Sequence, residues 1–315
     1  MMTSPDLAEL ARRARSMREA GLALVIASGV LALFLFIPLT PERQVSSADI
    51  VAATTAPLFA VASLEAQAAI VYDLATGKPL YEKNANAQLP LASLTKLLTV
   101  YAALAKLSPT TPITISREAA RAEYPHVFKA GQTFMFADIA RLTLTGSLND
   151  GAAAIAETVA AREGRSTSDM LAATAAALDL SATYAVNGSG LDMNTAVSGG
   201  YGSARDVARL AGALVQAAPD IAFATTLSAT EARSVSGAVY RVKNTNPTTE
   251  TIPRLLLSKT GYTDLAGGNL ALVFDAGIEH PIAIVVLGSS KDSRFTDGMA
   301  LVAATLAYFA GLSSL

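Results

Sequence analysis

Apolar residues follow strand-like patterns at both ends of the region after residue 66, and helical patterns between them. The run Ala68 to Asp73, a turn with Gly77, and the run Leu80 to Lys83 predict a β-hairpin. Near the end come further short apolar runs that predict strands, followed by a longer run with helical periodicity. These predicted elements are strands over 255–258, 270–274 and 282–287 and a closing helix over 295–310.

The middle of the chain is rich in alanine and has helical periodicity. The predicted helices cover residues 91–107, 136–144, 150–161, 168–178 and 203–217. Strands at both ends with helices between them, plus a terminal helix, predict the α+β class.

The helix predicted over 91–107 carries a candidate catalytic pair. Its apolar positions are Leu94, Leu97, Leu98, Tyr101 and Leu104. Ser93 falls in the first turn and Lys96 one turn later, so hydroxyl and amine share a helix face. An ordinary lysine, with a pKa of about 10.4, is a poor base at neutral pH. Burial and a second cation would lower the pKa of Lys96 enough for it to take a proton from Ser93.

The N-terminal region predicts membrane attachment. Arg12, Arg13, Arg15 and Arg18 precede a charge-free apolar run, 20–41, that is long enough to span a bilayer. Because arginines stay on the cytoplasmic side, the rest of the chain is expected outside. A cleaved signal peptide is the alternative, although the small residues at 60–62 lie far from the apolar run. The predicted organisation is a cytoplasmic tail (1–19), a transmembrane signal-anchor (20–39), a linker (40–66) and a catalytic domain (67–315).

Composition removes several classes of chemistry. The chain has no Cys and only two His in 315 residues, which excludes disulfides and thiolate sites and disfavours a Ser-His-Asp triad. His126 and His280 lie in a polar stretch and a turn, as ordinary surface histidines do. A net charge of −2 indicates no basic face for nucleic acid.

A second motif, Ser147-Leu148-Asn149, falls between two predicted helices. Ser147 is suited to relaying a proton, and Asn149 to orienting Lys96 or holding a substrate amide. Asn149 and Asp150 are also good N-cap residues, so helix capping is an alternative or additional role.

A third motif, Lys259-Thr260-Gly261, ends the apolar strand predicted over 255–258. Lys259 would supply positive charge to a substrate carboxylate and would help lower the pKa of Lys96, and Thr260 offers a hydroxyl to the same carboxylate. Gly261 would let a substrate backbone lie close to the strand edge.

The three motifs in this order resemble the set found in penicillin-binding proteins and class A β-lactamases. The extended phrase from Lys259 to Leu270 is similar to that of the D-alanyl-D-alanine peptidases, and the resemblance covers 68–312. Leu148 departs from the glycine more common there. The resemblance implies a β-lactamase/transpeptidase-like fold with an antiparallel sheet of about five strands, packed helices and a mostly helical subdomain.

The same resemblance implies a mechanism and partners. Ser93 attacks the bond between two D-alanines of a peptidoglycan pentapeptide, and Lys96 acts as base. Backbone N–H groups of Ser93 and Tyr262 form the oxyanion hole. Ser147 and Lys259 pass the proton to the leaving amine. The terminal carboxylate is held by Lys259, Thr260 and Arg294, and β-lactams are expected covalent inhibitors. The resemblance implies no metal and no organic cofactor.

Three other functions use similar residues. A D,D-endopeptidase acting on cross-links would use the same site, and the end of the chain at Leu315, without the further domain of many such carboxypeptidases, leaves it open. A class A β-lactamase would need a Glu in an E-x-x-L-N phrase after the second motif, which this sequence does not have. A penicillin sensor would be expected to carry an H-E-x-x-H motif, which is also missing from it.

Overall fold

The computed structural model describes residues 15, 17–18, 59–61 and 63–311. The predicted transmembrane segment (20–39), and nearly all of the tail before it, lie outside the described residues. Among the residues that are described, no helix combines the length and apolar character needed to cross a membrane.

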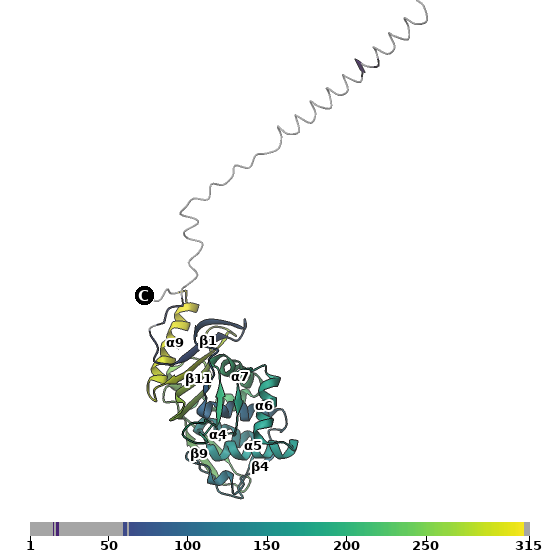
Figure 1. The fold of residues 1–315 in the computed structure, drawn as a ribbon, viewed down its shortest axis with the longest axis vertical. Coiled ribbons are helices and arrows are strands. Elements are labelled where there is room, and N and C mark those ends of the chain that lie inside the picture. The colour runs from purple at the N-terminus through teal and green to yellow at the C-terminus, as the bar shows by residue number, and fades with distance from the viewer. Residues whose placement is uncertain (1–14, 16, 19–58, 62, 312–315) are drawn as a thin grey trace, which may run out of the picture. The chain divides into compact units, whose positions relative to one another are not determined.

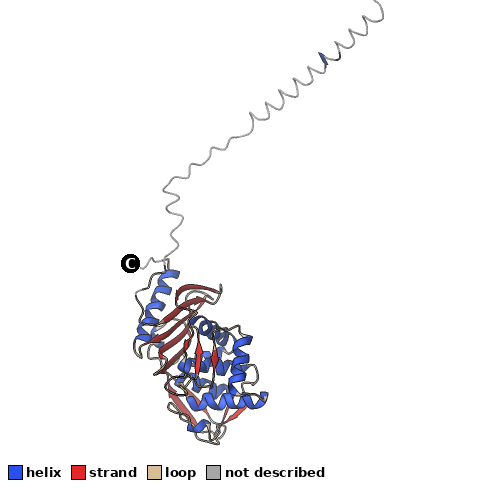
Figure 2. Cartoon of the chain, viewed as in Figure 1, coloured by secondary structure: helices blue, strands red, loops and turns tan. Residues whose placement is uncertain are grey.

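A five-stranded antiparallel sheet is the centre of the folded unit (Figure 1 and Figure 2). The strand order β10-β11-β12-β1-β2 places the N-terminal hairpin beside the last strand and leaves β10 at an edge. The strands are β1 (Ala68–Asp73), β2 (Lys78–Lys83), β10 (Leu255–Thr263), β11 (Gly267–Asp275) and β12 (Pro281–Ser289). The hairpin and the α+β class are confirmed, and the last three strands extend beyond their predicted ranges.

Both faces of this sheet are covered by helices. Alternate residues of β12 belong to two cores. Ile282, Ile284 and Val286 share one core with residues of α9 (Ser293–Phe309). Ala283, Val285 and Leu287 share the other with residues of α7 (Ala204–Ala217). Burial on both faces explains why the strands appear as uninterrupted apolar runs rather than as an alternation.

The predicted central helices form a mostly helical region beside the sheet (Figure 2). They are α3 (Thr95–Leu104), α4 (Phe136–Gly146), α5 (Asn149–Glu163) and α6 (Thr167–Ala177). A short helix, α8 (Pro219–Ala224), follows α7 directly and was not predicted.

Small secondary sheets were not predicted either, because most of their strands have only two or three residues, too few to show a period. Their strands are β3 (Leu89–Pro90), β4 (Pro112–Thr114), β5 (Thr133–Met135), β6 (Tyr184–Ala185), β7 (Gly200–Gly202), β8 (Ala229–Arg233) and β9 (Val239–Lys243).

The folded unit begins earlier than the predicted boundary at residue 67. Leu64 and Ala66, which precede that boundary, belong to the same core as residues of α9. The backbone N–H groups of Glu65 and Ala66 donate to the Asp297 carboxylate at 3.1 and 2.9 Å. Residues 64–66 have no periodicity that would predict an element. Contacts with α9, which lies far along the chain, hold them in place.

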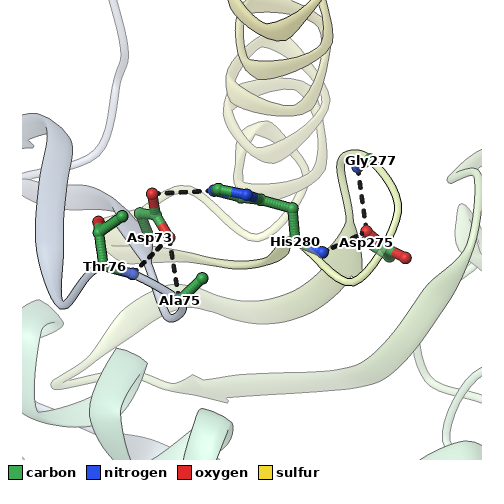
Figure 3. A network of polar contacts seen from close by, with 6 residues as sticks. All are labelled: Asp73, Ala75, Thr76, Asp275, Gly277 and His280. Carbon is green, nitrogen blue, oxygen red and sulfur yellow. Dashed lines mark hydrogen bonds and ion pairs between the residues drawn. The ribbon is translucent and has the colours of Figure 1, made fainter.

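His280 is not an ordinary surface histidine. Its ring nitrogen Nε2 lies 2.9 Å from the Asp73 carboxylate, whose other oxygen accepts hydrogen bonds from the backbone of Ala75 and Thr76 (Figure 3). Burial raises the pKa of Asp73, but the hydrogen bonds from His280 and Thr76 outweigh it, so the pKa lies below its ordinary value. The network ties the β1–β2 turn to the β11–β12 connection.

Replacing Asp73 by alanine should lower the free energy of unfolding at pH 7 by about 2 kcal/mol, as expected for lost hydrogen bonds to a charged group. Urea unfolding followed by circular dichroism measures this, with the exposed Asp220→Ala as control. Because the folded-state pKa is lowered, the contribution is present above the ordinary value of 3.8 and disappears as pH falls through the folded pKa. Equal losses in both variants would contradict this role for Asp73.

Candidate active site

Ser93 lies in a short turn that precedes the helix, not in the helix itself. The 3₁₀ turn covers Ala92–Leu94, and α3 begins at Thr95. Ala92 has a φ of +47°, a left-handed conformation that is uncommon for a residue with a Cβ. The sequence prediction of a continuous helix over 91–107 is therefore wrong at its start, because this turn reorients the backbone just before Ser93.

Lys96 is completely buried and its amine meets three oxygen atoms. Its Nζ lies 2.7 Å from Ser93 Oγ, 2.7 Å from Asn149 Oδ1 and 2.7 Å from the Ser189 carbonyl oxygen. A neutral amine has two N–H bonds and one lone pair. The two fixed carbonyl oxygens can accept the N–H bonds, which leaves the lone pair for the Ser93 hydroxyl.

The environment of Lys96 makes this amine a base at neutral pH. Burial lowers its pKa to about 7, and the nearby Asp150 carboxylate opposes part of that shift. The contribution of Lys259 to this lowering stays a prediction, since repulsion between two neighbouring cations acts on both of them. Burial first, then the charges of Lys96 and Arg294, hold the pKa of Lys259 well below its usual range.

Asn149 orients the lysine rather than capping a helix. Its Nδ2 donates to the carbonyl oxygens of Glu123 and Tyr124 at 3.0 and 3.2 Å, which fixes Oδ1 toward Lys96. Leu148 holds the N-cap position of α5 without a side-chain hydrogen bond. The capping role considered for Asn149 is therefore wrong.

Asp150 supports the same arrangement from outside the catalytic set. Its carboxylate accepts hydrogen bonds from the backbone of Val127 and Phe128 at 2.8 and 2.6 Å. These bonds hold the loop whose carbonyl groups orient Asn149. The other carboxylate oxygen of Asp150 accepts a hydrogen bond of 2.8 Å from the backbone N–H of Gly151. Asp150 thus supports this loop and caps only that N–H group at the start of α5.

Ser147 lies at the end of α4, where its backbone is left-handed with a φ of +57°. Its Oγ accepts a hydrogen bond from Lys259 Nζ at 2.8 Å, and Nζ also donates to the Thr260 carbonyl oxygen at 2.7 Å. The predicted connection between helices is confirmed. The structure thus pairs each lysine with its own serine: Lys96 with Ser93, and Lys259 with Ser147.

The third motif lies inside β10 instead of at its end, since the strand continues to Thr263. Thr260 shares a hydrogen bond of 2.6 Å with the Thr245 hydroxyl. A Cβ on Gly261 would lie 2.9 Å from the Leu91 carbonyl oxygen and 3.3 Å from the Ser93 backbone nitrogen. Glycine here therefore lets the edge strand approach the nucleophile segment, a reason that the sequence did not reveal.

Arg294 and Tyr262 complete the predicted set. Arg294 is largely buried at the start of α9, and its Nη1 donates to the Gly261 carbonyl oxygen at 2.6 Å. Burial lowers its pKa from the usual value. Tyr262 is exposed beside the Lys291 amine, which lies 5.5 Å from the ring centre. All nine predicted residues thus gather around the 3₁₀ turn at Ala92–Leu94, the start of α5 and β10.

Two further asparagines position the site, and sequence analysis assigned neither of them a role there. Asn187 Oδ1 accepts hydrogen bonds from the backbone of Ser189 and Gly190 at 3.1 and 2.7 Å, which holds the Ser189 carbonyl on Lys96. Asn269 donates to the Pro90 carbonyl oxygen at 3.0 Å, next to the nucleophile turn. Asn269 belongs to the phrase from Lys259 to Leu270 that carries the resemblance, and this phrase was the available signal.

Within the described part of the chain, no group of three or more His, Cys, Asp or Glu side chains is arranged to hold a metal ion.

The profile of the D-alanyl-D-alanine carboxypeptidase family, peptidase family S11, matches residues 50–291. The chain belongs to this family. Because the chain is a member of this family and its Ser93 is hydrogen-bonded to a buried lysine, it is a serine hydrolase.

Two similar proteins have names that state two different activities. The D-alanyl-D-alanine endopeptidase of Pseudomonas aeruginosa is 30% identical over 244 residues, which cover 76% of each chain. The D-alanyl-D-alanine carboxypeptidase DacC of Escherichia coli is 28% identical over 260 residues, covering 76% of this chain and 61% of the relative.

Solved structures agree with this family assignment and confirm the fold resemblance. Penicillin-binding protein D2 from Listeria monocytogenes, in its ampicillin-bound form, aligns with a TM-score of 0.66 and 27% identity over 78% of this chain and 98% of that one. The D-alanyl-D-alanine carboxypeptidase from Mycobacterium tuberculosis aligns with a TM-score of 0.68 and 26% identity over 80% and 94%.

Proposed function

We propose that this chain is a membrane-anchored serine D,D-peptidase that cleaves the terminal D-Ala-D-Ala bond of peptidoglycan stem peptides and so acts in cell-wall maturation. The single observation that carries the proposal is the buried Lys96 amine within 2.7 Å of Ser93 Oγ, Asn149 Oδ1 and the Ser189 carbonyl oxygen. This arrangement supplies a base for a serine nucleophile without histidine.

Acylation then follows from the geometry. Lys96 takes the proton of Ser93, whose oxygen attacks the carbonyl carbon between the two D-alanines. The backbone N–H groups of Ser93 and Tyr262 stabilise the oxyanion. The C–N bond breaks, and Ser147, hydrogen-bonded to Lys259, passes a proton to the leaving amine. Water later cleaves the ester on Ser93, with no metal or cofactor in the cycle.

Substrate binding is coupled to the charge of Lys259. Its low pKa in the free site follows from burial and from the neighbouring cations. A substrate carboxylate beside Lys259, Thr260 and Arg294 supplies the opposite charge, which favours the protonated amine and raises that pKa. Asn149 and Gly261 lie beside the same substrate. Asn149 contributes its side-chain amide, and Gly261 lets the substrate backbone approach β10 closely.

β-Lactams fit the same cycle as covalent inhibitors, because their amide can acylate Ser93. Support comes from penicillin-binding protein D2 of Listeria monocytogenes, which was solved in ampicillin-bound and cefotaxime-bound forms.

A D,D-endopeptidase is the second candidate, favoured by the 30% identical relative of that name. Incubation of the full chain with a D-Ala-D-Ala pentapeptide, and separately with a cross-linked dimer, followed by product analysis, distinguishes the two. Release of free D-alanine supports the carboxypeptidase, and separation of the dimer supports the endopeptidase. If the chain leaves both substrates intact, the proposed function is wrong.

The membrane anchor is proposed from the sequence, where four arginines precede the apolar run 20–41. A reporter that is active only outside the cytoplasm should work when fused after Leu315. An N-terminal tag that stays on the membrane-bound protein would support the anchor, whereas its loss on maturation would indicate a cleaved signal.

A further inference from the structure

A hollow lies beside the catalytic groups and has no part in the mechanism above. Its volume is about 400 Å³. Gly146 and Leu148, on either side of Ser147, line it, and so does Thr245. Residues of the loop at 124–127 and of the strand β9 complete its walls.

The hollow is on the leaving-group side of the proposed reaction. Ser147, which is proposed to protonate the leaving amine, lies between two of its lining residues. Thr245 contacts the hydroxyl of Thr260 at 2.6 Å, and Thr260 is proposed to hold the carboxylate next to that amine. A leaving group larger than D-alanine would therefore extend from these two groups into the hollow.

The walls combine cationic and apolar side chains. Arg241 and Lys243 project from the exposed face of β9, and neither belongs to an ion pair among the described residues. Tyr124 and Val127 contribute apolar surface and are 82% and 41% exposed. Leu148, where relatives commonly have glycine, is buried under this wall. Such a surface suits a ligand with methylene groups and free carboxylates.

We propose that this hollow binds the second stem peptide of a cross-linked substrate, with Arg241 and Lys243 recognising its carboxylates. The inference rests on the proposed D,D-peptidase function in its second form, the endopeptidase, and names the residues that would recognise a cross-linked substrate. Free D-alanine ends at the carboxylate beside Thr260 and does not reach these residues. Arg241 and Lys243 are thus specificity-determining residues for cross-linked peptides.

The chemical step is unchanged by the larger leaving group. The C–N bond to the side-chain amine of the second peptide breaks, and the C–O bond to Ser93 forms. The Ser93 proton goes to Lys96, and the leaving amine receives a proton from Ser147, which is hydrogen-bonded to Lys259. Water then releases the first peptide from Ser93.

The test compares the full-length parent with the double variant Arg241→Glu/Lys243→Glu. Arg233→Glu, a change of the same sign on the neighbouring strand β8 of the same hairpin but outside the hollow, is the matched control. Each protein is assayed with a purified cross-linked peptide dimer, a D-Ala-D-Ala pentapeptide and a fluorescent penicillin. For the dimer, we expect the double variant to lower kcat/KM at least about tenfold, mainly through KM, as for one lost charge-assisted hydrogen bond. Pentapeptide hydrolysis and penicillin acylation should stay within about twofold of the parent.

Three outcomes would overturn the inference. One is a parent that acylates with penicillin and hydrolyses the pentapeptide but leaves the dimer intact. Another is a double variant that cleaves the dimer as well as the parent does. The third is a loss of dimer cleavage in Arg233→Glu as large as that in the double variant. A loss in the double variant that is equally large for the dimer and the pentapeptide counts in the same way. A parent that neither acylates nor cleaves any substrate refutes the proposed function itself, and the inference falls with it.

Discussion

Ser93→Ala should abolish covalent labelling by a fluorescent penicillin. The hydroxyl is the nucleophile in the proposed site, and Lys96 Nζ lies 2.7 Å from it. The two other serines beside the lysines differ in the part of the chain that the structure describes, because Ser147 is paired with Lys259 and Ser189 meets Lys96 through its carbonyl oxygen. The measurement is in-gel fluorescence of the purified full chain, followed by mass spectrometry of the labelled peptide.

The control for this experiment is Ser236→Ala, an exposed serine in the turn between β8 and β9. It should label like the parent. An adduct located on a residue other than Ser93, or persistent labelling of Ser93→Ala, would show that the nucleophile has been assigned wrongly.

Lys96→Arg should lower the rate of penicillin acylation by a factor on the order of 10² to 10⁴, the range for a lost general base. A guanidinium keeps the charge but does not release its proton in the accessible pH range. Lys259→Arg keeps a cation beside the substrate carboxylate and should therefore retain measurable acylation with weaker substrate binding. The second-order acylation rate of both variants, measured between about pH 6 and pH 10, provides the comparison.

The pH profile of the parent adds a second readout. Because burial lowers the pKa of Lys96 to about 7, the fraction of neutral amine rises through that pH and is nearly complete at pH 9. The acylation rate should rise in the same range and then level off. If Lys96→Arg acylates nearly as fast as the parent while Lys259→Arg is inactive, the roles of the two lysines are reversed.

Local pattern was sufficient for the elements with strong periodicity. The strands β1, β11 and β12 and the helices α4 to α7 were predicted because their buried residues occur in runs or at helical spacing. The i and i+3 spacing of Ser93 and Lys96 was also sufficient to predict their contact, although Ser93 lies in a 3₁₀ turn rather than in the helix. The seven short strands of the secondary sheets were missed because pairing with distant segments forms them.

The sequence by itself determined the α+β class, the family resemblance and the candidate site residues, because these depend on side-chain types in local patterns. Only the tertiary structure decided how Lys96 becomes a base. Asn149 and Ser189 are 53 and 93 positions away from Lys96 along the chain, and the loop at 123–128 that orients Asn149 has no motif of its own. Burial of Lys96, which lowers its pKa, arises from the packing of distant segments, and no pattern within one helix specifies it.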